Sequence, residues 1–287
     1  MTQLHTRSQE RTPQGGDVLV DAGWLAAHLS DPSVRVVEVD VSPARYNEWH
    51  IDGALLWNVY SDLKDADYRL RDTRTLQTLL ERSGVAPDST VAFYGYAPEL
   101  GMWLMKLCGH RDVRILDCSR ETWQAAGHPW HTEAETATQS TYSLGAQDPS
   151  LRADRAYVEA ALSASAATLL DVRTSAEYRG ERFWPSGAPE PTGRAGHIPG
   201  AVHVPLDDIR DSRGALRSPE ELRERFSGQL DGDRELITYC TVGGRATTAW
   251  FVLTYLFGRD NVRVYDGGWA EWGHAPDTAI DVGSPRR

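Results

Sequence analysis

The chain of 287 residues has few lysines, few cysteines and no long apolar run. Lys64 and Lys106 are its only lysines, and its net charge is −11. This balance argues against a general binder of nucleic acid or of anionic membranes, because both partners require a basic face. No segment has the length and apolarity of a membrane span, and residues 1–16 are too polar for a secretory signal. We therefore expect a cytoplasmic protein.

Cysteine is also scarce, with Cys108, Cys118 and Cys240 only. An odd number without framework spacing does not predict disulfides, and the Cys-x-x-Cys and Cys/His patterns of zinc sites are missing. We expect reduced thiols, no metal and no organic cofactor. Burial preference predicts inert side chains for Cys108, which lies in an apolar helical segment, and for Cys118.

An internal repeat organises the rest of the chain. Residues 36–40 match residues 169–173, and each run is followed by a His-Ile-x-Gly-Ala motif, at His50 and at His197. Later apolar runs match in the same order, namely 90–94 with 235–239 and 112–117 with 261–266. This order indicates the duplication of one domain.

The matched runs are short and aliphatic, as buried parallel strands are. Helical segments alternate with them, at 21–29, 76–83, 102–108, 154–163, 219–226 and 246–257. Alternation of this kind predicts an α/β fold with helices flanking parallel sheets. We place one domain at 17–130, a linker rich in Thr, Ser, Ala and Gln at 131–149, and a second domain at 150–280.

The two halves differ behind their matched strands, where the first half has Gly95 and the second has Cys240. The next closing glycine is Gly109, 14 residues on, or Gly258, 18 residues on, so the second half has four more residues. A thiol within a full loop is therefore expected only in the second domain, and the first domain is predicted to be catalytically inactive.

The loop comprises Cys240, Thr241, Val242, Gly243, Gly244 and Arg245. It lies between a strand and a helix, at the carboxyl end of a parallel strand, where such sheets bind ligands. The two glycines allow a sharp turn, and N–H groups of the loop and of the first helical turn can converge on one anion. A thiolate is stabilised in such a place and acts as a nucleophile.

These motifs, together with Val264-Tyr265-Asp266-Gly267-Gly268-Trp269 and Glu271-Trp272, resemble the two-domain rhodaneses, the thiosulfate and 3-mercaptopyruvate sulfurtransferases. The resemblance covers about Val18 to Gly273. It implies two tandem rhodanese domains, each a mostly parallel five-stranded sheet flanked by helices, with the site of the second domain at the domain interface. It also implies that Cys240 accepts sulfur as a persulfide and that Arg173 and Arg179 bind the substrate.

Physical reasoning on the arginines agrees with that implication. An arginine at a strand end, such as Arg173, is expected to face the crevice of Cys240, where it can fork onto a sulfonate or carboxylate. Arg245 either orients the loop or reaches the substrate. His50 and His197 are expected to be structural, because their motif recurs in the half without a thiol.

The loop departs from both branches of the family. Thr241 and Val242 stand where the thiosulfate enzymes have basic residues and the mercaptopyruvate enzymes have Gly and Ser, and Asn58 stands where the latter have an aspartate. The predicted reaction moves sulfur from a small donor anion to a thiophilic acceptor such as cyanide or a thiol. Thiosulfate is the preferred donor and 3-mercaptopyruvate the alternative, with neither nucleic acid nor membrane as partner.

Two alternative functions are also compatible with the cysteine loop. The chain could relay persulfide sulfur from one protein to another in a sulfur-incorporation pathway, in which case the same residues are expected. A Cdc25-type phosphatase is the second alternative, but its loop has five residues between Cys and Arg. Here only the four residues 241–244 lie between them, which makes a cradle better suited to one sulfur than to phosphate.

Overall fold

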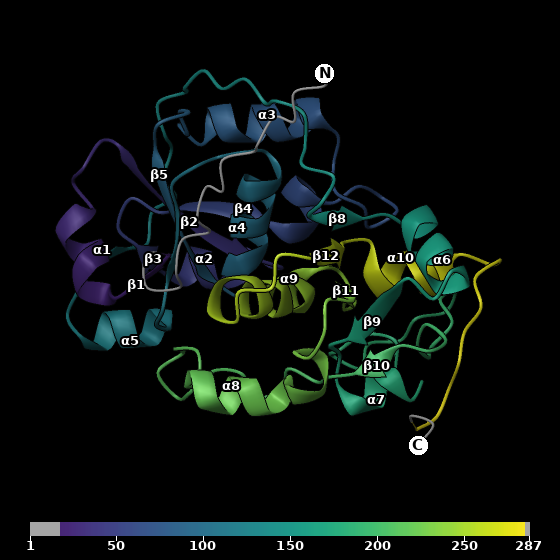
Figure 1. Cartoon of the computed structure of the whole chain (residues 1–287). Coiled ribbons are helices and arrows are strands. Elements are labelled where there is room, and N and C mark those ends of the chain that lie inside the picture. Colours follow the sequence, from purple (N-terminus) through teal and green to yellow (C-terminus); the bar gives the residue numbers. More distant parts are fainter. Residues whose placement is uncertain (1–17, 285–287) are drawn as a thin grey trace, which may run out of the picture.

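The computed structural model describes residues 18–284 and contains two α/β domains, one after the other along the chain (Figure 1). The first sheet has the parallel order β1-β6-β5-β2-β4, with β1 (Leu19–Val20), β2 (Val34–Asp40), β4 (Leu55–Asn58), β5 (Thr90–Gly95) and β6 (Val113–Leu116). The second has the parallel order β10-β9-β11-β12-β8, with β8 (Arg152–Ala153), β9 (Ala167–Asp171), β10 (Val202–His203), β11 (Glu235–Tyr239) and β12 (Val262–Tyr265). Read from its other edge, the second order repeats the first, so the predicted fold and its duplication are confirmed.

Helices cover both faces of the sheets. They are α1 (Ala22–His28), α2 (Ala44–Glu48), α3 (Thr73–Arg82), α4 (Pro98–Leu107) and α5 (Arg120–Ala125) in the first domain, and α6 (Arg155–Ser163), α7 (Ser175–Tyr178), α8 (Pro219–Arg225), α9 (Gly244–Phe251) and α10 (Gly268–His274) in the second. Short π-helical turns lie at Val59–Leu63 and Val252–Leu256, and a 3₁₀ turn lies at Ser227–Gln229. Across residues 18–284, none of the helices has the length and apolarity needed to cross a bilayer.

The starts of several helices follow directly from the sequence. Asp21, Asp72 and Asp154 precede α1, α3 and α6, and each side chain accepts a hydrogen bond from a backbone N–H of the first turn. Such caps satisfy donors that a helix cannot pair internally. The helical segment predicted to run to residue 257 instead passes from α9 into the π-helical turn at 252–256.

The domains meet through α4 and α9, which follow the equivalent strands β5 and β11 (Figure 1). A Cβ atom built on Gly244 would lie only 3.3 Å from the Cβ of Ala97, so the helices approach closely at their beginnings. Met102 and Trp103 of the first domain share one buried hydrophobic cluster with Trp250 and Phe251 of the second. The cysteine loop is therefore held by a core common to both domains.

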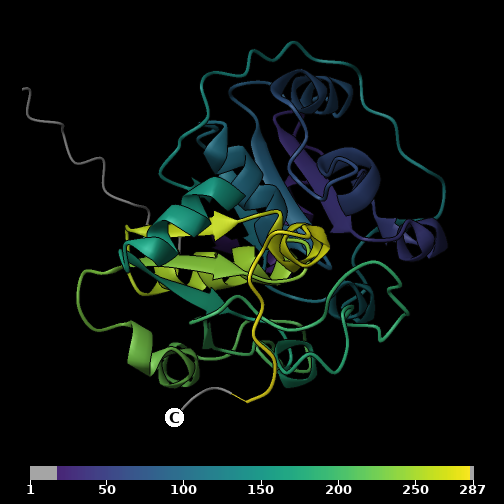
Figure 2. The ribbon, with the colours of Figure 1, turned by 90° about the vertical axis from the view of Figure 1, so that its right-hand side faces the viewer.

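The segment 131–149 connects the domains along the surface of the first and passes over α3 (Figures 1 and 2). It begins in β7 (Trp130–His131), which pairs antiparallel with β3 (His50–Ile51). Tyr142 is buried against the first domain, and Ser140 N donates to Glu81 O at 2.9 Å. The linker is thus packed along its path.

Candidate active site

Cys240 directly follows β11 and precedes α9, and only 2% of its surface is exposed. Gly243 N donates to its Sγ at 3.1 Å, and Gly243 has a φ of +100°, which a glycine adopts without strain. One backbone donor of the loop therefore meets the sulfur. The loop carbonyls are also held, because Trp269 N and Ala270 N donate to the oxygens of Cys240 and Thr241 at 2.8 and 3.0 Å.

Gly268 allows the start of α10 to come close enough to hold the carbonyls of the cysteine loop. Its φ is +56°, and an added Cβ would lie 2.5 Å from the carbonyl oxygen of Cys240. Gly258 also has a positive φ, +71°, but nothing lies within 4 Å of an added Cβ.

We expect Gly268→Ala to lower the free energy of unfolding by about 2 kcal/mol or more, because it combines left-handed strain with a clash against the loop. Gly258→Ala should cost only the left-handed strain, about 1 kcal/mol. Urea unfolding of both variants measures the difference. Equal losses would mean that the contact with the loop carbonyl is not tight.

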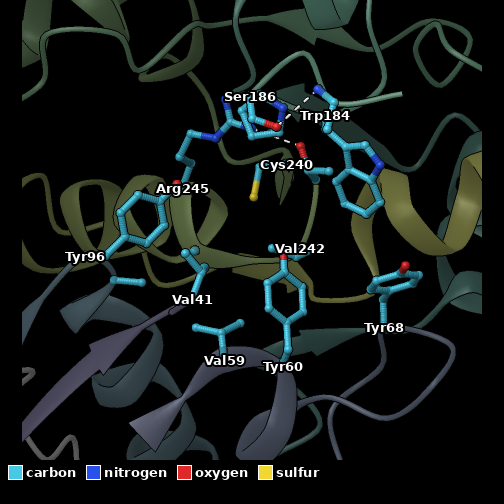
Figure 3. A pocket seen from close by; sticks show the side chains of 15 residues that line it. Val41, Val59, Tyr60, Tyr68, Tyr96, Trp184, Ser186, Cys240, Val242 and Arg245 are labelled. Carbon is cyan, nitrogen blue, oxygen red and sulfur yellow. Dashed lines mark hydrogen bonds between the residues drawn. The ribbon is translucent and has the colours of Figure 1, made fainter. Parts of the chain in front are cut away.

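A cavity of about 560 Å³ opens in front of Cys240, between the two domains (Figure 3). The first domain supplies three aromatic rings, Tyr60, Tyr68 and Tyr96, and the second supplies Trp184. In Figure 3 the sulfur of Cys240 projects into the space between these rings. The remaining lining residues are Val41, Val59, Ala97, Pro185, Ser186, Ala188, Thr241, Val242, Gly244 and Arg245.

Arg245 lines this cavity but is engaged by Glu177. Its Nη1 and Nη2 donate to the two carboxylate oxygens of Glu177, each at 2.8 Å, and Nη2 also donates to Thr241 Oγ1 at 2.9 Å. Thr241 in turn donates to Glu177 at 2.7 Å. Burial opposes the charge of Glu177, but these bonds hold the pKa of its carboxyl at about 2. The positive charge of Arg245 is therefore already compensated beside the thiol.

Arg173 lies outside the cavity, in the core of the second domain. Its Nη2 donates to Asp171 at 2.6 Å and to Gly196 O at 2.7 Å, and its guanidinium lies 4.5 Å from the ring centroid of Trp269. Asp171 also accepts from the Tyr239 hydroxyl at 2.6 Å. The side chain expected to face the crevice instead turns into the domain, where its Nε and Nη2 are hydrogen-bonded and its Nη1 has no partner among residues 18–284.

The first domain contains an equivalent arrangement. Glu38 lies at the place of Asp171, Arg120 donates to it at 3.1 Å, and the Arg120 guanidinium lies 4.0 Å from the ring centroid of Trp49. Because the first domain has no thiol at this place, the shared arrangement favours a structural role for Arg173, although Arg120 comes from α5 and not from the strand end.

The structure does not bring Arg179 to the cavity either. It is partly exposed and forms an ion pair with Glu181 at 2.6 Å. His50 and His197 play matching roles, since their Nδ1 atoms donate to the carbonyls of Tyr46 and Tyr178 at 2.9 and 2.8 Å. Each ring also stacks on that tyrosine, as a structural residue does.

Gly95, the counterpart of Cys240, lies in a much tighter place. Its φ is +104°, and an added Cβ would meet Glu38 Cγ at 2.9 Å and Val39 O at 3.0 Å. The next residue, Tyr96, instead reaches across to line the cavity of the second domain. The first domain therefore contributes a wall to the cavity in front of Cys240.

Sequence reasoning missed this wall and missed Glu177. Tyr96 stands where the other half has Thr241, so comparison of the two halves contained a signal for it. Glu177 completes a Thr-x-x-Glu capping box with Thr174, which is a second usable signal. Tyr60 and Tyr68 lie in a π-helical turn and a loop without periodicity, and no pattern marks them.

Comparisons with known proteins find relatives along nearly the whole chain. The family model described as "Rhodanese-like domain" matches residues 21–126 and 154–275. A protein of Mycolicibacterium smegmatis named "Putative thiosulfate sulfurtransferase" is 37% identical, over 93% of this chain and 99% of its own length. The "Sulfur carrier protein TtuD" of Thermus thermophilus is 35% identical, over 93% and 97%.

Solved structures show the same fold. The anaerobic ergothioneine biosynthesis enzyme from Chlorobium limicola, in complex with trimethyl histidine, has a TM-score of 0.81 at 24% identity and covers 94% of this chain and 71% of its own. The structure of YnjE has a TM-score of 0.77 at 26% identity, over 93% of this chain and 68% of its own.

Proposed function

The chain belongs to the rhodanese family, and from that premise we propose that it transfers sulfane sulfur through a persulfide on Cys240. The observation that carries the proposal is the position of the Cys240 sulfur, which accepts a backbone N–H and faces an interdomain cavity. Burial raises the pKa of the Cys108 and Cys118 thiols to about 11, so both are protonated at neutral pH. Neither lines the cavity.

The proposed reaction has two steps. The Cys240 thiolate attacks the outer sulfur of the donor, the bond from that sulfur to the rest of the donor breaks, and the leaving group takes the electron pair. For thiosulfate the leaving group is sulfite. An acceptor nucleophile then attacks the outer sulfur of the persulfide and releases the thiolate. The N–H of Gly243 can stabilise the charge on sulfur in both states, and the scheme predicts ping-pong kinetics.

Mass spectrometry tests the intermediate directly. After incubation with donor, one added sulfur should appear on the peptide that contains Cys240, in the wild type and in Cys118→Ser alike. The donors to compare are thiosulfate, 3-mercaptopyruvate and a persulfide-loaded desulfurase. Absence of the adduct with all three would contradict the proposal.

The compensated charge of Arg245 affects how well the cavity binds a charged donor such as thiosulfate. Arg245 is paired with Glu177, and Thr241 and Val242 are neutral, so a dianion such as thiosulfate meets little net positive charge. We expect Glu177→Gln to lower the KM for thiosulfate by about threefold or more, because it leaves the Arg245 charge uncompensated in a partly buried place.

Glu181→Gln is the matched control, since it removes the same kind of partner from Arg179 outside the cavity. Its KM should equal that of the wild type. An unchanged KM in Glu177→Gln would mean that the charge of Arg245 does not contribute to binding of the donor. The comparison requires only the thiosulfate and cyanide assay at neutral pH.

A protein-to-protein sulfur relay is a second candidate function. A relative at 35% identity is named a sulfur carrier protein, and the neutral, aromatic cavity favours no small dianion. A relay should turn over thiosulfate and cyanide slowly but exchange sulfur rapidly with a partner protein. Single-turnover transfer from the Cys240 persulfide to candidate acceptor proteins, compared with transfer to cyanide, separates the two functions.

The arrangement of Arg245 argues against a phosphatase. Its guanidinium is held by Glu177 and Thr241, whereas phosphate binding requires an arginine fork free for the ligand. Turnover of an aryl phosphate that is lost in Cys240→Ser would overturn the preference for sulfur transfer.

A further inference from the structure

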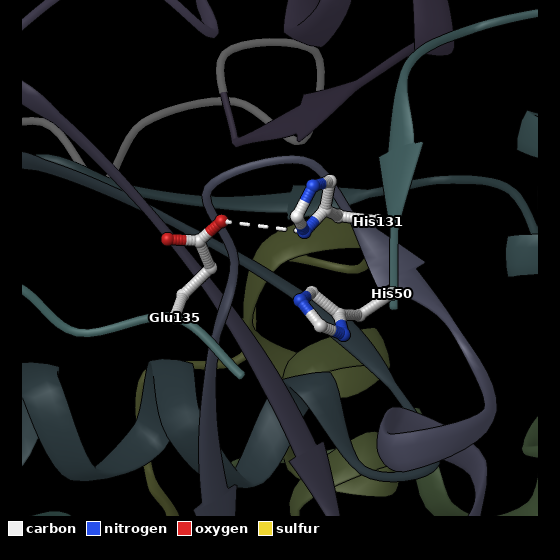
Figure 4. Close-up of side chains that lie close together, drawn as sticks. All are labelled: His50, His131 and Glu135. Atoms are coloured by element: carbon white, nitrogen blue, oxygen red, sulfur yellow. Dashed lines mark ion pairs between the residues drawn. The ribbon is translucent and has the colours of Figure 1, made fainter. Parts of the chain in front are cut away.

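A second group of reactive side chains lies in the first domain, outside the cavity of Cys240. His50, His131 and Glu135 each offer a ligand atom, and these atoms all lie within 4.8 Å of one another (Figure 4). We propose that these three residues form a binding site for a divalent transition-metal ion, with Zn²⁺ as the best match to two imidazoles and a carboxylate.

His50 provides the independent observation. It is completely buried, and its Nε2 has no hydrogen-bond partner among residues 18–284. A buried polar atom without a partner is costly, and a bound cation would satisfy it. In Figure 4 the ring of His50 turns this free side toward His131 and Glu135.

The surroundings of His50 also prepare it as a ligand. Its Nδ1 donates to Tyr46 O at 2.9 Å, which leaves the lone pair on Nε2, and its ring stacks on Tyr46 at a centroid distance of 3.9 Å. Metal-binding histidines commonly donate their second nitrogen to a carbonyl or carboxylate, because this fixes the tautomer and the ring orientation. The most rigid member of the group is therefore already oriented.

The other two ligands come from the start of the linker. His131 is the cross-strand partner of His50 in the β3–β7 pair, and its Nδ1 lies 4.0 Å from the Glu135 carboxylate. Ligands at about 2.0–2.2 Å from Zn²⁺ lie roughly 3.3–3.6 Å apart in a tetrahedron, so binding requires a small closure. His131 is exposed and Glu135 is partly exposed, so both side chains can adjust while His50 stays in place. The Nδ1 of His131 accepts a long hydrogen bond from Glu133 N, at 3.3 Å, which a metal ion would replace.

The second domain offers an internal comparison. His197 repeats the Nδ1 bond and the tyrosine stacking of His50, but its paired residue is Asp281. Within the part of the chain that the structure describes, His50, His131 and Glu135 are the only such group of three. The metal site would thus belong to the domain without a thiol at the position of Cys240, where it would fasten the start of the linker to β3.

Titration of the full chain with Zn²⁺, and with Co²⁺ as a spectroscopic probe, tests the proposal. Cys240→Ser serves as the background, so that the reactive thiol does not bind the metal. We expect one equivalent to bind, with a rise in Tm and a visible Co²⁺ absorption typical of tetrahedral nitrogen and oxygen ligation. His131→Ala and Glu135→Gln should each raise the Kd for the metal by at least about tenfold and remove the rise in Tm.

Asp281→Asn is the matched control, because it changes the equivalent position of the second domain. It should bind the metal as the background does. Both test variants alter side chains that are at least partly exposed, and circular dichroism verifies their fold. Equal Kd values in background, His131→Ala and Glu135→Gln would overturn the proposal, as would the absence of saturable binding below millimolar Zn²⁺.

Discussion

Cys240→Ser is expected to lower kcat/KM for sulfur transfer by at least about 10³-fold, because a hydroxyl is not ionised at neutral pH and cannot hold the transferred sulfur as a persulfide. The loop itself should survive. Its backbone is fixed by Gly243, by Trp269 N and by Ala270 N, and none of these contacts except the one to Sγ involves the side chain.

The measurement is the assay with thiosulfate as donor and cyanide as acceptor. If another donor reacts faster, that donor takes the place of thiosulfate. Cys118→Ser is the matched control, since it makes the same change at a half-buried thiol outside the cavity, and its kcat/KM should be unchanged. Thermal unfolding should show Cys240→Ser close to the wild type. Residual activity near the wild-type level would locate the reaction elsewhere.

Asp266→Asn should produce the largest loss of stability, about 3–5 kcal/mol, because it leaves the buried ammonium of Lys64 and the partly buried guanidinium of Arg152 without their carboxylate. Asp266 is almost completely buried at the domain interface. It accepts from Lys64 Nζ at 3.2 Å, from Arg152 Nε at 2.7 Å and from Leu70 N at 2.7 Å. Lys64 and Leu70 belong to the first domain, so one carboxylate joins both domains.

Asp277→Asn provides the control, since Asp277 pairs with Arg155 at the surface, where such pairs contribute about 0–1 kcal/mol. Urea unfolding of both variants gives the comparison. Activity should fall as well in Asp266→Asn, because the residues that follow it supply Trp269 N and Ala270 N, which hold the loop carbonyls. Equal stabilities of the two variants would refute the role of this interface.

The pH dependence of this effect has a definite sign. Burial opposes the charge of Asp266, but Lys64 and Arg152 lower its pKa below the ordinary 3.8. A carboxyl with a depressed pKa stabilises the fold fully above its unfolded value and loses that contribution as the pH falls through the folded value. The stability difference between wild type and Asp266→Asn should therefore be constant near neutrality and shrink below about pH 4.

The duplication, the parallel α/β sheets and the cysteine loop could be predicted from the sequence, because repeated apolar runs and a strand–loop–helix motif are local patterns. These patterns do not predict the order of the strands within each sheet. The role of Arg173 could not. Asp171 lies two residues before it, on the same side of an extended chain, and takes the guanidinium that we expected at the substrate. Sequence spacing locates a strand end, but it does not show which partner a long side chain reaches.

The interdomain wall shows a second limit. Tyr60, Tyr68 and Tyr96 line the cavity although they lie more than 140 residues before Cys240. Their position depends on how α4 packs against α9, which no local pattern specifies. Glu177 is an intermediate case. The sequence pattern indicates its capping box, but it does not indicate its bond to Arg245.

Gly95 has a consequence for the history of the two domains. Two of the four glycine codons, GGT and GGC, are a single nucleotide from a cysteine codon, so a glycine at the position of Cys240 is not remote from a thiol in coding terms. The backbone closes that route, because any side chain at Gly95 must adopt a left-handed conformation and displace Glu38 or the Val39 carbonyl. A thiol at this position would therefore require changes in the surrounding residues as well as the substitution itself.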